Sequence, residues 1–446
     1  MKTFMLLVCA ISLSCFAQAQ HLDTRQLADK VRTEFVRAWK GYKKHAWGHD
    51  GYRPLSNTSY DWHRETLYLT ALESLDTMTL MGLKEEADST REFLATHLSF
   101  NKDISVSVFE ITIRVLGALI ANFELSGDQR LLNLADSLAT RLSPAFVSGT
   151  GMPYRLVNLK TGAVSGEASN PAEAGTLLLE WGTLSALTGK PAFYNYAKNS
   201  LLRVYEYRSA IGLVGDAIDV NTAKWKGTDS HLSACIDSYY EYLLKSAILF
   251  GDADCETMWS ASYAAINTYL LDSSKAGFWY GHADMKTGKR TQTLFGTLDA
   301  FFPAVQVLAG DVPRARRLMN SCFTMWKKHD IEPDQYDYAK GVVERPGYHL
   351  NPEIIESAYY LYRATGDSLY LRMGKTFLDN LITYCATSEG FAELTSVVTK
   401  EKLDRMEPYF MAETMKYLYL LFAPPEVLPL ESVIFTTEGH PLRRGG

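Results

Sequence analysis

The sequence lacks the signals of several large classes of protein. Its net charge is −6 and it has no long basic run, so a nucleic-acid partner is not expected. No G-x-G-x-x-G follows a predicted strand, and the chain has neither a G-x-S-x-G elbow nor an H-E-x-x-H motif. Nucleophilic serine or cysteine chemistry therefore has no local support.

Cysteine is also scarce. The 446 residues include 6 cysteines, and Cys9 and Cys15 lie in the N-terminal leader. The others are Cys235, Cys255, Cys322 and Cys385. They are too few for a disulfide scaffold, and their spacings match no zinc pattern. We expect one disulfide or none.

Long apolar runs are confined to the N-terminus. "MKTFMLLVCAISLSCFAQAQ" has one lysine, an apolar run and Ala17-Gln18-Ala19, which predicts a secretory signal peptide over residues 1–19. A lipoprotein signal ending at Cys15 is the alternative, but Ser12 stands where such a signal has Leu. Since no other stretch approaches the roughly 18 apolar residues of a membrane helix, we expect an exported monomer without a membrane span.

The remaining chain, 20–446, is predicted to be one domain of helical hairpins. Apolar residues recur at three and four spacing in many segments, among them Val108–Phe123, Asp237–Phe250 and Pro352–Arg363. The breaks repeat a pattern: "LSGD" at 125–128, "LTGK" at 187–190, "LFGD" at 249–252 and "ATGD" at 364–367. Extended pieces look few and short, such as 151–159 and 432–439. An all-α fold follows, either a closed barrel or an open helical solenoid.

Acidic residues occur in apolar helical contexts where a solvated face is not expected. They are Glu110, Glu180, Asp237, Glu241, Glu353, Glu356, Glu413 and Glu438. One such carboxylate alone is usually a helix cap or half of a salt bridge. Together they have too few basic partners, Arg114 being one, and unpaired buried carboxylates are costly. A shared polar cavity that holds a metal with oxygen ligands, a sugar or both satisfies this pattern better.

Several long motifs resemble glycoside hydrolase family 47, the class I α-mannosidases. They include "SVFEITIRVLGALIANFELSGD", "DSYYEYLLK", "PEIIES", "AETMKYLYLLF" and "FTTEGH", in order along nearly all of the mature chain. Other stretches, such as "AFFPAVQVLAGD", are similar to the EDEM-like branch. The resemblance implies an (α/α)7 barrel of helical hairpins, with a few short β-hairpins that plug or line one end. It favours the closed ring over the solenoid.

The resemblance also implies an activity, the hydrolysis of α-1,2-linked mannose with inversion and with Ca²⁺. Glu110 matches the proton donor, acting directly or through a water, and Glu353 matches the base, with Asp237 as a third catalytic candidate. Inversion needs two carboxyl groups about 6.5–9.5 Å apart. Thr437 matches the calcium ligand. Substrate contacts are expected from Arg114, Glu180, Glu241, Glu356, Glu413 and Glu438, and from either Glu73 or Asp76.

Some positions depart from the family pattern. Asn351 stands where the family usually has Arg before the base, and Tyr409 replaces a sugar-stacking Phe. Both positions contact sugar, so the linkage or branch preference of this chain is open. No catalytic carboxylate is missing, and we expect an active enzyme acting on mannose-containing oligosaccharides or N-glycans. The alternative is an EDEM-like glycan-binding protein with little or no catalysis.

The short leader and a single glycosylation sequon, Asn57-Thr58-Ser59, favour a bacterial protein. We expect it to be periplasmic or secreted, in preference to the ER lumen.

Overall fold

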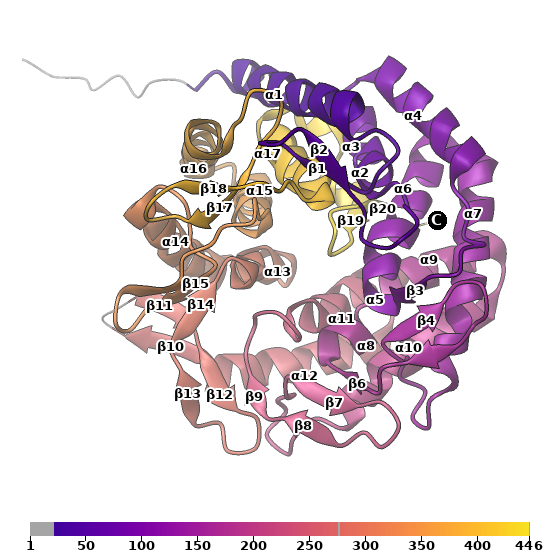
Figure 1. Ribbon diagram of the computed structural model, residues 1–446. Helices are drawn as coiled ribbons and strands as arrows, with labels where there is room; N and C mark the ends of the chain where they lie inside the picture. Colours follow the sequence, from indigo (N-terminus) through magenta and orange to yellow (C-terminus); the bar gives the residue numbers. More distant parts are fainter. Residues whose placement is uncertain (1–21, 275–276, 446) are drawn as a thin grey trace, which may run out of the picture.

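Two concentric rings of helices form a closed barrel in the computed structural model, which describes residues 22–274 and 277–445 (Figure 1). The predicted signal peptide lies outside the described residues. The inner ring holds α2 (Leu69–Glu73) with α3 (Leu75–Leu80), α5 (Val108–Ile111) with α6 (Gly117–Ser126), α8 (Pro171–Gly175) with α9 (Leu178–Thr188), α11 (Asp237–Phe250), α13 (Phe302–Leu308), α15 (Glu353–Thr365) and α17 (Met415–Phe422).

The outer ring alternates with the inner one along the chain. It consists of α1 (Thr24–His45), α4 (Lys84–His97), α7 (Gln129–Leu142), α10 (Pro191–Glu206), α12 (Ala253–Tyr269), α14 (Val312–His329) and α16 (Ser368–Asn380). Helix α1 packs against α17, so the first helix meets the last and the ring closes. The prediction of an (α/α)7 barrel is confirmed, and the open solenoid is excluded.

The two rings differ in their hydrophobic pattern, and this difference explains their positions. Helix α9 is apolar around most of its circumference and is almost entirely buried, as a helix packed on both sides must be. Outer helix α14 is amphipathic, with buried side chains at three and four spacing from Ala315 to Trp326. The hydrophobic core therefore fills the layer between the rings, and polar inner residues are left to face the barrel axis.

The repeated apolar-x-Gly-Asp pattern forms the turns from inner to outer helices. Gly251 and Gly366 end α11 and α15 in the left-handed conformation, with φ of 63° and 66°, which a Cβ-bearing residue adopts at a cost. The aspartate that follows each glycine then caps the next helix, because Asp252 accepts from Cys255 N–H and Asp367 from Leu369 N–H. Two residues thus end one helix and begin the next.

Strands are more numerous than the sequence suggested, although all are short. The described residues form antiparallel sheets of two or three strands: β1 (Gly51–Arg53) with β2 (Thr58–Tyr60); β3 (Ser105–Ser107), β4 (Leu156–Asn158) and β5 (Val164–Ser165); β6 (Ala168–Ser169), β7 (Ala217–Asp219) and β8 (Trp225–Gly227); β9 (Asp229–Ser230), β12 (His282–Asp284) and β13 (Arg290–Gln292); β10 (Leu271–Ser274) with β11 (Gly277–Tyr280); β14 (Leu294–Gly296), β15 (Gln335–Asp337) and β16 (Val342–Arg345); β17 (Glu393–Ser396) with β18 (Glu401–Leu403); β19 (Val433–Phe435) with β20 (Pro441–Arg443). Strands β4 and β19 fall within the extended pieces predicted at 151–159 and 432–439. The other strands were not predicted, because two to four residues are too few to show an alternating pattern.

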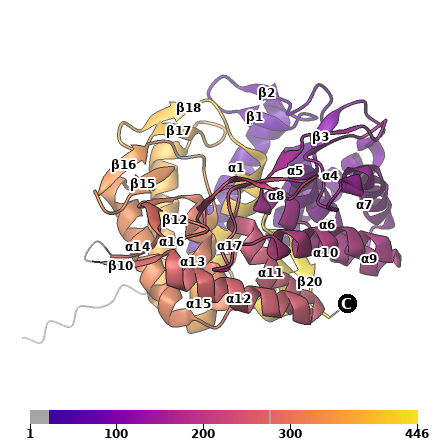
Figure 2. The same cartoon turned by 90° about the horizontal axis from the view of Figure 1, so that it is seen from below.

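Several of the sheets lie at the ends of the barrel. In Figure 2, strands β1, β2, β3, β17 and β18 lie along the upper edge, whereas β20 lies near the lower edge. Figure 1 places the β19–β20 hairpin inside the ring of inner helices. The turn of this hairpin, with Thr437 and Glu438, lines the axial cavity, in keeping with the short β-hairpins that the resemblance implied at one end of the barrel.

Short helical segments of other types complete the fold over the described residues. In this part of the chain, three are π-helical: η1 (Thr112–Leu116), η4 (Leu381–Cys385) and η5 (Phe410–Thr414). Four in the same part of the chain are 3₁₀ segments: η2 (Ser143–Val147), η3 (Leu298–Phe301), η6 (Pro425–Val427) and η7 (Leu430–Ser432). The cysteines Cys235, Cys255, Cys322 and Cys385 are all free thiols, in line with the expectation of one disulfide or none.

Candidate active site

A cavity of about 450 Å³ lies on the barrel axis above the β19–β20 hairpin. That volume suits one or two sugar rings, since small-molecule pockets run from about 300 to 1,000 Å³. The cavity collects most of the residues predicted from sequence: Glu110, Arg114, Asp237, Glu241, Asn351, Glu353, Glu356, Tyr409, Glu413, Thr437 and Glu438. They come from five different parts of the chain, and only a closed ring brings them together.

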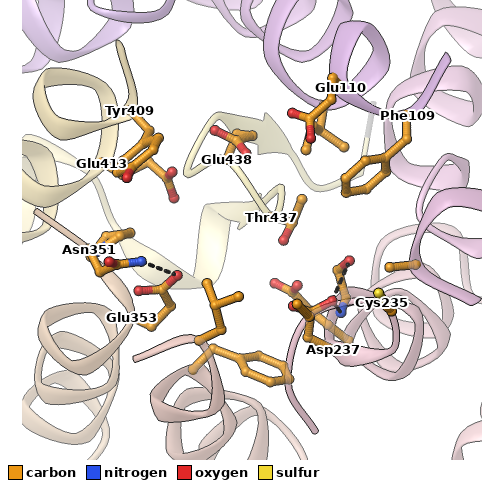
Figure 3. A pocket seen from close by; sticks show the side chains of 18 of the residues that line it. Phe109, Glu110, Cys235, Asp237, Asn351, Glu353, Tyr409, Glu413, Thr437 and Glu438 are labelled. Atoms are coloured by element: carbon orange, nitrogen blue, oxygen red, sulfur yellow. Dashed lines mark hydrogen bonds between the residues drawn. The ribbon is translucent and has the colours of Figure 1, made fainter. Parts of the chain in front are cut away.

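The candidate catalytic carboxylates face one another across the cavity. In the close-up view, Thr437 stands near the centre, Glu110 extends from one wall, and Asp237 and Glu353 extend from the opposite side (Figure 3). Each of the three carboxylates lies at or near the start of an inner helix: Asp237 opens α11, Glu353 opens α15 and Glu110 lies in the first turn of α5. Helix N-termini attract negative charge, which helps to hold carboxylates at these positions.

Arg114 joins three of the acidic residues. Its Nε donates to Glu110 Oε2 at 2.9 Å and its Nη1 to Glu438 Oε2 at 2.7 Å, while Glu73 Oε2 lies 3.4 Å from Nη1. Its guanidinium group also lies against the rings of Trp62 and Tyr409, at 5.0 and 5.6 Å from their centroids. The shorter bond goes to Glu438, so Arg114 holds the hairpin turn as well as Glu110. The side chain of Glu110 is 35% exposed, against 9% for Glu438, and is the more open to a ligand.

Two of the π-helical segments lie in the cavity wall. Segment η1 carries Arg114 between α5 and α6, and η5 carries Glu413 just before α17. A π turn inserts an extra residue into a helix and changes the direction of the neighbouring side chains, and such turns are frequent at functional sites. Hydrophobic spacing does not distinguish them from α-helix, and the sequence therefore predicted one continuous helix over Val108–Phe123.

Burial raises the pKa values of the carboxyl groups in the cavity. It raises the pKa of Asp237 to about 7, and the negative charges of Glu241 and Asp299 add to the effect. The pKa of Glu353 is raised well above its ordinary value by burial and by Glu356 and Asp237. Asn351 Nδ2 approaches Glu353 Oε1 at 3.4 Å, and Glu353 Oε2 is buried without a partner among the described residues. Both carboxyl groups are thus shifted toward the range in which proton transfer is useful.

Carboxyl groups also cluster around Thr437. Burial raises the pKa of Glu413 well above its ordinary value, with Glu438 and Glu353 adding to it. It raises the pKa of Glu356 to about 8, although Lys245 opposes the shift. The N–H of Thr437 donates to Tyr242 Oη at 3.3 Å, and the structure shows no hydrogen bond to its hydroxyl or carbonyl oxygen from a described residue. This oxygen-rich, electron-rich region suits a hard cation.

A buried network anchors the turn that carries Thr437. Lys416 Nζ lies 2.8 Å from Asp76 Oδ1 and donates to the carbonyl oxygen of Gly439 at 2.7 Å. His440 Nδ1 contacts the other oxygen of Asp76 at 2.7 Å. Asp76 therefore supports the hairpin from below, whereas Glu73 contacts Arg114. Neither of these two candidates from "ALESLDT" lines the cavity itself.

Glu180 occupies a different place from the one the sequence suggested. It is fully buried and does not line the cavity; its Oε1 accepts from Tyr242 Oη at 2.5 Å. A Cβ atom at Gly117 would lie 3.5 Å from Glu180 Cγ and 3.2 Å from His440 Cδ2. The small residue at 117 thus lets η1 and α6 pack closely over this buried carboxyl group.

The cavity contains functional-type residues that the sequence analysis did not single out, including Cys235, His349 and the pair Arg155–Glu173, which are 2.9 Å apart. A signal for Glu173 was present. "NPAE" at 170–173 resembles "NPE" at 351–353, and both mark the start of an inner helix next to the cavity, since Pro171 opens α8 and Pro352 directly precedes α15. Cys235 and His349 lie in irregular segments, where no periodic pattern marks a residue as inward-facing.

Comparison with known proteins gives a consistent result. Residues 34–444 match the family model for glycosyl hydrolase family 47. The chain is 36% identical to alpha-mannosidase I MNS5 of Arabidopsis thaliana, covering 97% of this chain and 80% of that protein. It is also 36% identical to the ER degradation-enhancing alpha-mannosidase-like protein 2 of Mus musculus, covering 94% and 78%.

Solved structures agree with these relatives. The α-1,2-mannosidase from Trichoderma reesei superposes with a TM-score of 0.86 at 25% identity, over 94% of this chain and 99% of that one. A cellobiose 2-epimerase from Bacillus thermoamylovorans superposes with a TM-score of 0.57 at 11% identity, over 89% of this chain and 99% of the epimerase. The second likeness shows the fold alone.

Proposed function

The chain belongs to glycosyl hydrolase family 47, and we propose that it is an exported, calcium-dependent, inverting α-mannosidase that removes terminal α-1,2-linked mannose from mannose-rich glycans. One observation carries the proposal. The closed barrel brings Glu110, Asp237 and Glu353, from three separate inner helices, to one cavity around Thr437. Carboxyl groups on facing walls of a sugar-sized cavity are what inverting hydrolysis of a glycoside requires.

The proposed roles follow from the position of each carboxyl group. Glu110, on one wall and bonded to Arg114, gives a proton to the leaving oxygen, directly or through a water. Glu353, on the opposite wall, takes a proton from the attacking water. Attack from the face opposite to the leaving group inverts the anomeric carbon. Asp237 lies on the same side as Glu353 and is the second candidate for the base.

Calcium fits the oxygen-rich region around Thr437. We propose that the carbonyl and hydroxyl oxygens of Thr437 hold the ion, with waters positioned by Glu356, Glu413 and Glu438. The excess of carboxyl groups over the cations that contact them, Arg114 and Lys245, supports a bound divalent ion. When bound, the ion would supply positive charge that fixes sugar hydroxyl groups at the cavity floor.

Export rests on the leader at residues 1–19, and we propose that residues 20–446 are a single mature domain. No helix among the described residues is long and apolar enough to cross a membrane.

The test uses α-1,2-mannobiose as substrate and follows the released sugar by NMR. The purified protein is assayed with calcium, after treatment with a chelator, and after calcium is restored. Release of β-mannose that depends on calcium supports the proposal. Release of the α-anomer would contradict inversion. Binding of mannobiose without release would instead favour the EDEM-like glycan-binding alternative.

A further inference from the structure

Two histidines and an aspartate lie together at the three-stranded sheet β13-β12-β9, whose strands lie along the lower edge of the ring in Figure 1. Asp229 is in β9, His282 is in β12, and His231 directly follows β9. Strands β12 and β9 are antiparallel, with Asp284 opposite Asp229 and Ala283 opposite Ser230. Continuing this register places His282 opposite His231. Because side chains alternate along a strand, Asp229, His231 and His282 share one face of the sheet.

The donor atoms of these side chains converge. One ligand atom from each of Asp229, His231 and His282 lies within 4.8 Å of the other two. His282 Nδ1 lies 2.6 Å from Asp229 Oδ2, and the two imidazole rings are 4.4 Å apart at their centroids. Around a tetrahedral ion with bonds of about 2.0–2.2 Å, ligand atoms are roughly 3.4 Å apart, so binding requires only small side-chain movements.

The surroundings hold the aspartate in place and leave an excess of negative charge. Asp229 also accepts from Thr291 Oγ1 at 2.7 Å and from Gln292 Nε2 at 3.3 Å, the kind of outer contact that orients a metal ligand. A further carboxyl group, Asp216, lies nearby, and its Oδ1 is buried without a partner among the described residues. The neighbouring Arg290 directs its guanidinium group to the carbonyl oxygens of His282, Leu270 and Leu271.

We propose that Asp229, His231 and His282 bind a transition-metal ion of the Zn²⁺ type, through two imidazole nitrogens and one carboxylate oxygen, with water at the remaining position. Nitrogen donors favour zinc over calcium or magnesium, so this site differs in chemistry from the oxygen-only region at Thr437. His231 Nδ1 currently accepts from Ser233 N–H at 3.2 Å, and binding through that nitrogen would replace this long hydrogen bond.

Binding there would hold the segment that leads to a candidate catalytic residue. Strand β9 ends at Ser230, and residues 231–236 run directly to Asp237 at the start of α11. The ion would tie this segment to β12 of a different hairpin. The inference goes beyond the proposed function and does not depend on it, because metal content is measured without substrate.

The test measures zinc binding to protein without an affinity tag, in the presence of excess calcium. Wild type is expected to bind one zinc ion per chain by titration calorimetry, and to retain it after dialysis as measured by mass spectrometry. The variants His231→Gln and His282→Gln are each expected to bind zinc at least about tenfold more weakly than wild type. Removing a group that only contacts a metal ligand already costs roughly tenfold in affinity, and these variants remove the ligand itself. His97→Gln, on the exposed end of α4, is the matched control and should bind as wild type does.

Cobalt provides a readout that does not depend on the variants. Cobalt bound by wild type through imidazole and carboxylate should give visible absorption bands stronger than those of the hydrated ion. The absence of saturable zinc binding would overturn the proposal. So would equal zinc binding by wild type and by both variants with native circular dichroism; the cluster would then be a hydrogen-bonded Asp229–His282 pair beside His231.

Discussion

At the scale of single residues, the cavity wall contains charged side chains whose burial is costly unless a partner stabilises them. Glu110 and Arg114 are four apart on an apolar helix, and each is stabilised because it faces the barrel axis rather than the core. Arg114 has carboxylate partners on three elements, whereas Glu353 Oε2 has none among the described residues. A buried carboxyl group without a partner is costly in stability and useful in proton transfer.

The first prediction concerns Glu353. Glu353→Gln removes the ability to accept a proton while it preserves the shape of the side chain. We expect turnover of α-1,2-mannobiose to fall by at least about 10²–10⁴-fold, the usual contribution of a general base, with calcium binding unchanged. The control is Glu256→Gln on the exposed face of α12, which should keep full activity. If Glu353→Gln fails to fold, the residue is structural.

The second prediction concerns the pH dependence of stability through Asp237. Its pKa is raised in the folded protein from 3.8 to about 7, so the folded state holds this proton more tightly than the unfolded state. The contribution to stability is fully present below about pH 4 and is lost as pH rises through about 7. A shift of this size corresponds to something on the order of 4 kcal/mol.

The measurement compares wild type with Asp237→Asn, whose side chain cannot ionise. Urea unfolding between pH 4 and 8, with a chelator to exclude calcium, should show the variant gaining stability relative to wild type as pH rises. A constant difference across this range would contradict the raised pKa.

At the scale of elements, the β19–β20 hairpin links the barrel to its site. The hairpin carries Thr437 and Glu438, and its turn is held by Lys416 on α17 and Asp76 on α3. The packing of two inner helices therefore determines the height of Thr437 in the cavity. The hairpin follows all the other cavity-lining elements in the sequence, and it completes a site that also includes Glu110 from the first part of the chain.

The third prediction compares a buried ion pair with an exposed one. Lys416→Met removes the lysine cation from buried Asp76 and leaves it with His440 and the Thr77 hydroxyl as partners. We expect a loss of about 3–5 kcal/mol in the free energy of unfolding. The substitution should also weaken calcium binding, because the turn at Gly439 loses its donor. Lys30→Met breaks the exposed Lys30–Asp379 pair, 2.9 Å apart, and should cost less than about 1 kcal/mol. Equal effects in urea unfolding would show that Lys416 does not act through the buried pair.

At the scale of the whole molecule, closure of the ring determines how the protein folds. Helix α1 packs on α17, so residues near the two ends of the described chain share one core. In an open solenoid each repeat contacts only its neighbours, and a shortened array keeps its structure. A ring that lacks one hairpin exposes apolar surface on both sides of the gap.

The fourth prediction follows from closure. Deleting residues 367–446 removes α16, α17 and the β19–β20 hairpin. We expect the truncated chain to lose native circular dichroism and cooperative unfolding altogether. A product that keeps most of the helical signal and a sharp thermal transition would mean that the repeats are stable independently.

Much of the fold could be predicted from sequence because its signals are local. The spacing of apolar residues predicted α11 at Asp237–Phe250, the range that the structure shows, and Gly-Asp pairs marked the turns. Most of the short strands and the π turns could not be predicted, because their hydrogen bonds and direction depend on partners elsewhere. His231 and His282 are 51 positions apart in the printed sequence, and only the register of β9 with β12 brings them together.

The sequence alone determined that the chain forms helical hairpins and that its inner faces carry carboxyl groups, because periodicity, capping and composition act over a few residues. Only the tertiary structure decided which carboxyl groups face the cavity and which are paired. Arg114 meets Glu438 across 324 positions, Glu180 is turned toward Tyr242, and Asp76 supports the hairpin. The reason is physical: the cost of a buried charge depends on the partners that reach it, and those partners come from the whole ring.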